Sequence, residues 1–199
     1  MICFTDHYHF LAWKALADSL GIPFDEAKND RLRGVSRMAS LEIVLEEYHG
    51  PALSDEDKVR LAEKKNDLYR ASLQFMTPAD LSDEVRDTLN ALRARGIKLA
   101  IGSSSKNAPL ILERIGLGGY FDAVSDGNNI THSKPDPEVF TMAAQMLNLP
   151  ADQCLVVEDA LAGVQAAAAG GFHSAGIGPA AKSGLATYPL NTFSDLLKL

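Results

Sequence analysis

Three short segments of this sequence carry residue types that could bind a phosphate or a divalent cation. CLVVED ends in the adjacent carboxylates Glu158 and Asp159, and SSSKN (residues 103–107) places hydroxyls and a lysine after another apolar run. The third, THSKPDP, places Lys134 before a proline. Carboxylate oxygens suit hard cations such as Mg²⁺. Hydroxyls, a lysine and the free N–H groups of a helix start suit an anion.

Each of these segments also has an ordinary structural explanation. An acid or a serine at the start of a helix can cap it by accepting a free backbone N–H, which would account for Glu158–Asp159 and for Ser103. A lysine before a proline-bounded helix start is commonly a solvated surface residue, which would account for Lys134. Taken singly, none of the three segments decides between structure and chemistry.

The elements predicted around these segments bring them together. From about residue 81, short β-branched runs alternate with helical patterns, which is typical of a parallel sheet with helices on both faces. Ligands bind such sheets just outside the carboxyl ends of the strands, where all three segments fall. The predicted strands lie in IKLAIGS, FDAVSD, CLVVED and HSAGIG, and the predicted helices cover about 84–95, 107–116, 137–147 and 160–169.

The first 80 residues follow a different pattern. Apolar residues recur at helical spacing from Asp6 to about Phe75, and no convincing strand interrupts them. Gly21 is a typical helix stop, and Ser54 before three acidic residues is a typical helix start. The sequence therefore predicts two domains, a helical one over 1–80 and an α/β core over 81–199.

Composition limits the classes of partner and compartment. The formal charge of −7 without a Lys/Arg cluster argues against nucleic acid and against an anionic membrane surface. No run is long and apolar enough for a membrane span, and the N-terminus lacks the pattern of a signal peptide. Cys3 and Cys154 sit in apolar runs without metal-ligand spacing, so we expect core thiols in a cytoplasmic protein.

The order of these segments resembles the haloacid dehalogenase superfamily of phosphotransferases, and within it the β-phosphoglucomutase-like family. The resemblance covers almost the whole chain. It implies a Rossmannoid parallel sheet with helices on both faces, plus an N-terminal helical cap domain. It rests on YHFLAWKALADSLGI, LRGVSRMASL, KKNDLY, GSSSKNAPLILERIGLGGYFDAV, SKPDPEVF and VEDALAGVQA.

The resemblance assigns roles to residues of the α/β core. Asp159 would be a ligand of Mg²⁺, with Glu158 beside it in the metal's shell. Ser103 and Lys134 would hold the transferring phosphoryl group and neutralise the charge on its oxygens. Two further positions near the same site are matched by Lys106 and Asn107.

The resemblance also assigns roles in the cap. Arg37 would grip the substrate's non-reacting phosphate, which suits a guanidinium fork. His9 matches a position that faces the substrate and the catalytic acid; without the resemblance, it would be taken for a half-buried or surface helix residue. Positions that line the substrate space are matched by Trp13, Ser40, Lys65 and Asn66.

One element of the family is not found in its usual place. Its chemistry begins at a strand that ends in Asp-x-Asp, about a dozen residues before YHFLAWK, and that strand lies between those matched by KLAIGS and CLVVED. Aligned through Tyr8 and His9, this chain starts too late for it, so the central strand, nucleophile and acid/base are expected to be missing. A slipped alignment would end a strand on Asp6, but its partner two residues on would be Tyr8.

The resemblance implies the interconversion of β-glucose 1-phosphate and glucose 6-phosphate, through an aspartyl-phosphate and a sugar bisphosphate. It also implies a small phosphorylated sugar as the partner, and a monomer where the full core is present. A shortened version of such an enzyme would be inactive as written. Two alternatives stay open: a small-molecule phosphatase of the same superfamily, and a non-catalytic phosphosugar-binding or interaction protein.

Overall fold

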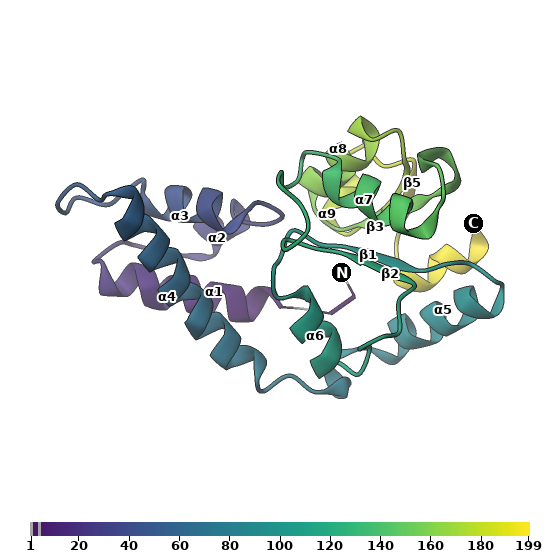
Figure 1. Cartoon of the computed structure of the whole chain (residues 1–199), viewed down its shortest axis with the longest axis horizontal. Helices are drawn as coiled ribbons and strands as arrows, with labels where there is room; N and C mark the ends of the chain where they lie inside the picture. Colours follow the sequence, from purple (N-terminus) through teal and green to yellow (C-terminus); the bar gives the residue numbers. More distant parts are fainter. Residues whose placement is uncertain (1, 4) are drawn as a thin grey trace. The chain divides into compact units, whose positions relative to one another are not determined.

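The computed structural model describes residues 2–3 and 5–199 (Figure 1). Their contacts divide them into two compact units, residues 5–76 and residues 77–199 together with 2–3. The domain bounds 1–80 and 81–199 remain a prediction. None of the helices formed by the described residues is long and apolar enough to cross a membrane.

The unit of residues 5–76, called here the helical unit, contains helices and no strand in its described part. Its long helix α4 packs against α1 and α3. A buried cluster that includes Trp13, Leu16 and Leu41 forms its core. Leu16 is fully buried, so its truncation to alanine should cost about 2–5 kcal/mol of stability. The helices are α1 (Asp6–Ser19), α2 (Glu26–Asp30), α3 (Arg37–Leu45) and α4 (Asp55–Leu73).

Local chemistry sets the helix ends that matter for this unit. Gly21, just past α1, has φ +69°, a left-handed conformation that a residue without Cβ adopts at little cost. At α4, the Ser54 hydroxyl accepts from the Asp57 N–H at 3.1 Å, and the Asp57 carboxylate accepts from the Ser54 N–H at 2.9 Å. This is a capping box. The predicted stop at Gly21 and start at Ser54 are both confirmed.

The unit of residues 2–3 and 77–199, called here the α/β unit, alternates strands and helices as predicted. The helices match the predicted ones closely, while the strands are shorter than the apolar runs that predicted them. The elements are η1 (Pro78–Asp80), α5 (Asp83–Ala94), β1 (Ala100–Gly102), α6 (Ala108–Arg114), β2 (Ala123–Ser125), α7 (Glu138–Leu147), η2 (Ala151–Gln153), β3 (Leu155–Glu158), α8 (Leu161–Ala169), β4 (His173–Ile177), α9 (Pro179–Lys182), β5 (Tyr188–Leu190) and η3 (Phe193–Lys198).

The described strands pair in parallel, in two separate groups. β1 pairs with β2, with Ile101 opposite Val124, and β3, β4 and β5 form a three-stranded sheet in that order. Among the described residues, β1 and β3 therefore each pair along one edge only. The α/β class is confirmed, with the sheet in two parts.

Helices cover these strands and complete the core of the α/β unit. α7 packs on β1 and β2, and α8 packs on β3 and β4. Val139 and Phe140 of α7 share a buried cluster with Val156 of β3. α7 therefore contacts both parts of the sheet.

The prediction of core thiols is confirmed only in part, since Cys154 packs against the buried cluster of the α/β unit from its edge. Cys3 and Cys154 are free, as expected, but each is only partly buried. Cys154 lies just before β3 begins, outside the buried middle of the strand. Burial nonetheless raises the pKa of both thiols.

Candidate active site

Glu158, the first acid of the pair at the end of β3, holds a positive charge supplied by the chain itself. Glu158 is buried, and its Oε1 forms an ion pair with the Lys134 ammonium. Its Oε2 accepts from the backbone N–H groups of Asp159 at 3.2 Å and Ala160 at 3.4 Å, just before α8. Glu158 thus serves both the helix start and the lysine.

Lys134 links the ends of two strands. Its side chain is 8% exposed, and its Nζ donates to the carbonyl oxygen of Gly102 at 3.2 Å as well as to Glu158. Gly102 ends β1 and Glu158 ends β3. Lys134 is therefore not the solvated surface lysine of the structural explanation. An ammonium has three N–H donors, so the two protein acceptors leave one for a ligand.

Hydroxyls shape the loop that follows β1. The Ser103 N–H donates to the Ser125 carbonyl of β2 at 3.0 Å, and Ser103 Oγ accepts from the Ser105 N–H at 3.2 Å. Ser105 Oγ accepts from the Asn107 N–H at 3.1 Å. Asn107, not a serine, is the cap residue of α6, and it makes no side-chain capping bond. Because Ser103 Oγ acts here as an acceptor, its O–H remains a donor for a ligand.

The turn at Gly127 and Asn128 supports this loop. The sequence did not indicate this contact. A Cβ on Gly127 would lie 2.6 Å from the Ser104 carbonyl oxygen, so the turn and the loop touch backbone to backbone. The Asn128 amide donates to the Lys106 carbonyl at 3.1 Å. Ser104 Oγ is buried and has no hydrogen-bond partner in the described part of the chain. Buried polar atoms normally have one, so this hydroxyl is a further candidate ligand contact.

Another buried cation among the predicted site residues lies in the helical unit. Lys65 on α4 is 3% exposed, and its Nζ lies 2.8 Å from His9 Nδ1 on α1. Its Nζ also lies over the rings of Trp13 at 4.6 Å and Tyr69 at 4.7 Å. His9 stacks on Tyr69 with ring centroids 4.0 Å apart. The structure thus joins three predicted residues and adds Tyr69, which lies four residues after Lys65 on the same helix face.

The pKa values of Lys65 and His9 are strongly shifted. Burial, with a smaller contribution from Arg37, lowers the pKa of Lys65 to about 7. Burial, and then Lys65 and Arg37, lower the pKa of His9 well below its usual 6.5. Among the described residues, no carboxylate lies within ion-pair distance of Lys65. A neutral imidazole that accepts at Nδ1 from the ammonium fits both shifts.

The remaining predicted cap residues lie on α3 and α4. Arg37 is half-buried at the start of α3, and burial lowers its pKa, against Glu63 and Asp67, which raise it. Ser40 is buried on α3, and Asn66 is half-buried on α4.

The residues at the end of β3 offer the type of ligand atom that a hard cation prefers. Glu158 and Asp159 supply carboxylate oxygens, and Mg²⁺ is commonly held by one or two carboxylates with waters and substrate phosphates. Glu158 Oε1 is engaged by Lys134, so an ion there would compete with the ammonium. A separate group of His132, Asp136 and Glu138 also has metal-binding residue types. There the Glu138 carboxylate already accepts the N–H groups of the preceding loop.

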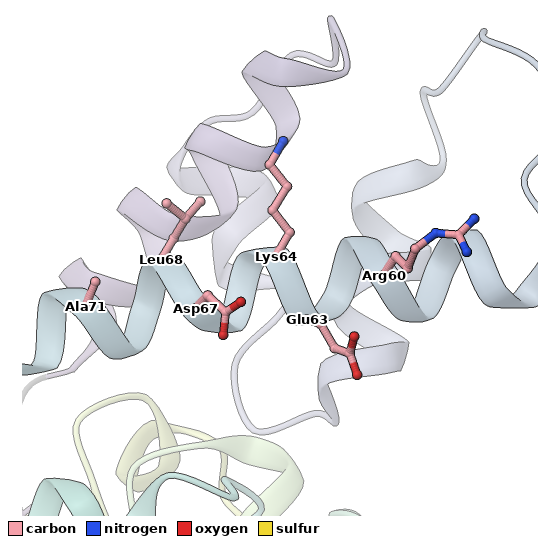
Figure 2. A pocket seen from close by; sticks show the side chains of 6 residues that line it. All are labelled: Arg60, Glu63, Lys64, Asp67, Leu68 and Ala71. Carbon is pink, nitrogen blue, oxygen red and sulfur yellow. The ribbon is translucent and has the colours of Figure 1, made fainter.

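One groove of about 470 Å³ lies along α4 (Figure 2). Its lining side chains come from successive turns of this one helix and carry both signs of charge. None of the predicted site residues lines it. The lining residues are Arg60, Glu63, Lys64, Asp67, Leu68 and Ala71.

Comparisons with known proteins agree on one superfamily. A family model described as haloacid dehalogenase-like hydrolase matches residues 2–171. The chain is 39% identical over 177 residues to β-phosphoglucomutase from Bacillus subtilis, covering 87% of this chain and 77% of that protein. It is 30% identical over 171 residues to a fructose-1-phosphate phosphatase from Escherichia coli, covering 85% and 87%.

A solved structure is also very similar. The crystal structure of β-phosphoglucomutase from Clostridium difficile superposes with a TM-score of 0.91 at 34% sequence identity. The match covers 98% of this chain and 88% of that one. The likeness thus extends over both units of the chain.

Proposed function

The chain belongs to the haloacid dehalogenase-like hydrolases, and we propose that within this family it is a phosphosugar mutase of the β-phosphoglucomutase type. The proposed reaction interconverts β-glucose 1-phosphate and glucose 6-phosphate through an aspartyl-phosphate and a sugar bisphosphate. Similar proteins include both a mutase and a sugar-phosphate phosphatase. The choice between them must therefore come from the chain's own residues.

The α/β unit would bind the transferring phosphoryl group. The Lys134 ammonium and the hydroxyls of Ser103 and Ser104 are donors near the end of β1, and they would neutralise charge on the phosphoryl oxygens. Glu158 and Asp159 would hold a Mg²⁺ ion, which would supply further positive charge to the phosphate. Lys106 and Asn107 continue the loop that carries the serines.

The observation that carries the mutase proposal is a buried lysine of the helical unit that an anionic ligand would keep charged. Lys65 is buried without a carboxylate partner among the described residues, and Arg37 adds a second cation to its field. An intermediate with two phosphates needs a second anion site, and a buried cation without a counter-ion would provide one. A phosphatase that hydrolyses a monophosphate does not need this second site.

The nucleophile of the proposed reaction is a separate question. In the family, an aspartate at the end of a strand attacks phosphorus and forms the phospho-enzyme. None of the described strands ends in Asp-x-Asp. We therefore expect the 199 residues alone to catalyse no transfer, because donors and a metal cannot replace the attacking carboxylate.

The experiment measures glucose 6-phosphate formed from β-glucose 1-phosphate, with a trace of sugar bisphosphate as primer. Two proteins are compared: the 199-residue chain, and the same chain preceded by a family-type strand that ends in Asp-x-Asp. Turnover by the second alone is the expected result. Release of inorganic phosphate from many sugar phosphates, without isomerisation, would favour the phosphatase. Binding without turnover by either would favour the phosphosugar-binding protein, and turnover by the 199 residues alone would point to Asp6.

A further inference from the structure

Two uncharged residues, Phe140 and Gly163, enclose the Lys134–Glu158 pair and limit where its side chains can lie. Lys134 lies under the ring of Phe140, with Nζ 4.6 Å from the ring centroid. Glu158 lies against Gly163 in the first turn of α8. Neither residue was indicated by the sequence as part of a site.

Phe140 presents a fixed aromatic face to the ammonium. Its ring is 7% exposed and packs on Gly102, where an added Cβ would lie 2.7 Å from the ring's Cδ1. On another side it meets Phe172 edge-on, with ring centroids 6.2 Å apart. The ring therefore cannot easily turn away from Lys134. An ammonium over such a face is attracted by the ring quadrupole. This attraction holds one side of the Lys134 ammonium against the ring.

Gly163 plays the corresponding part for the carboxylate. A Cβ at this position would lie 2.6 Å from both Cγ and Oε1 of Glu158. The carboxylate occupies the volume that any other residue would fill. Its two oxygens are thereby divided, Oε1 toward Lys134 and Oε2 toward the N–H groups of Asp159 and Ala160.

We propose that Phe140 and Gly163 are positioning residues that aim the Lys134–Glu158 pair, so that the free N–H of Lys134 points to a phosphate. The inference rests on the proposed function, because it takes Lys134 to be a phosphate ligand. Phe140 does this through its aromatic face, and Gly163 by leaving room for the carboxylate.

The test for Phe140 uses inorganic phosphate, titrated into the 199-residue chain and followed by the amide NMR shifts of residues 103–107. Phe140→Leu keeps an apolar side chain without a ring, and Phe140→Tyr restores the ring. We expect Phe140→Leu to weaken phosphate binding about threefold to tenfold and Phe140→Tyr to stay near the original affinity. Phe172→Leu is the matched control, because it removes a ring from the same cluster that does not lie over Lys134. Equal losses in Phe140→Leu and Phe172→Leu would overturn the role of the aromatic face.

The test for Gly163 is a double-mutant cycle on the melting temperature. In a helix, alanine is normally preferred to glycine. We expect Gly163→Ala to lower the melting temperature in the original chain and to raise it when Glu158→Ala is also present. A stabilising Gly163→Ala in the original chain would overturn the role of the missing Cβ.

Lys134→Ala separates this inference from the proposed function. If Lys134→Ala binds phosphate as well as the original chain, the phosphate role of Lys134 fails, and the inference fails with it. If Lys134→Ala loses binding while Phe140→Leu and Gly163→Ala do not, the inference alone fails.

Discussion

The two units contain one buried lysine each among their proposed site residues, and they accommodate it in different ways. Lys65 and Lys134 are 3% and 8% exposed, and each ammonium lies 4.6 Å from the centroid of an aromatic ring. Lys134 has the Glu158 carboxylate as an internal counter-ion. Lys65 has the imidazole of His9.

The difference indicates what each lysine is for. A buried ion pair satisfies its own charge, so the Lys134 pair belongs to the fold whether or not a ligand is present. A buried ammonium without a counter-ion is costly, and the lowered pKa of Lys65 reflects that cost. An anionic ligand would remove it. Within the described part of the chain, the protein supplies no counter-ion for the Lys65 ammonium, as is expected of a residue that binds an anionic ligand.

The largest effect is expected from breaking the pair. Lys134→Ala leaves the Glu158 carboxylate buried and uncompensated, which should cost about 3–5 kcal/mol of stability. Lys134→Met combined with Glu158→Gln should recover most of the loss, because no buried charge remains. Urea unfolding followed by circular dichroism measures both variants. A loss below about 1 kcal/mol for Lys134→Ala would show that the pair is solvated.

The second prediction concerns the anion site of the helical unit. Arg37→Ala should weaken binding of a sugar bisphosphate more than of a monophosphate, by about 2–5 kcal/mol if the contact is desolvated. Arg31→Ala is the matched control, because that guanidinium is exposed and paired with Glu46. Calorimetric titration of both ligands gives the difference. Equal losses for the two ligands would exclude Arg37 from the second phosphate site.

Lys65 should make stability depend on pH. Its pKa is lowered from 10.5 to about 7 on folding, so the unfolded chain binds more protons between these values. Stability should therefore rise with pH across this range, by up to about 1.4 kcal/mol per pH unit. Below pH 7, the cost of burying the charged Lys65 ammonium is fully present. His9, whose pKa is also lowered, adds a rise that ends near its usual 6.5.

Lys65→Met tests this pH dependence directly. Fluorescence of Trp13, the single tryptophan of the sequence, reports on the surroundings of Lys65. Unfolding at pH 6, 7, 8 and 9 should show a rising stability for the original chain. The variant should be more stable at pH 6 and should lose the rise above pH 7. The same slope in both proteins would show that Lys65 keeps its charge when buried.

The sequence predicts what depends on neighbouring residues. The cap at Ser54, the stop at Gly21 and the order of strands and helices follow from local spacing, and the structure confirms them. Phe140 and Gly163 could not be found this way, because their roles arise from contacts between different elements. The partial exposure of Cys154 has the same origin, since an apolar run does not say which of its residues lies at the edge.

The smallest effect is expected from Mg²⁺, which would compete with Lys134 for Glu158. Glu158 Oε1 is engaged by Lys134, so a Mg²⁺ ion must displace the ammonium or rely on Asp159. Millimolar Mg²⁺ should therefore stabilise the chain by less than about 1 kcal/mol, as for a ligand near its Kd. Lys134→Met should increase the effect, because Glu158 loses its internal cation, whereas Lys65→Met should leave it unchanged. Melting curves with and without Mg²⁺ measure all three proteins. A large shift in the original chain would mean that other residues complete the metal site, and an unchanged shift in Lys134→Met would mean that the ammonium does not compete for Glu158.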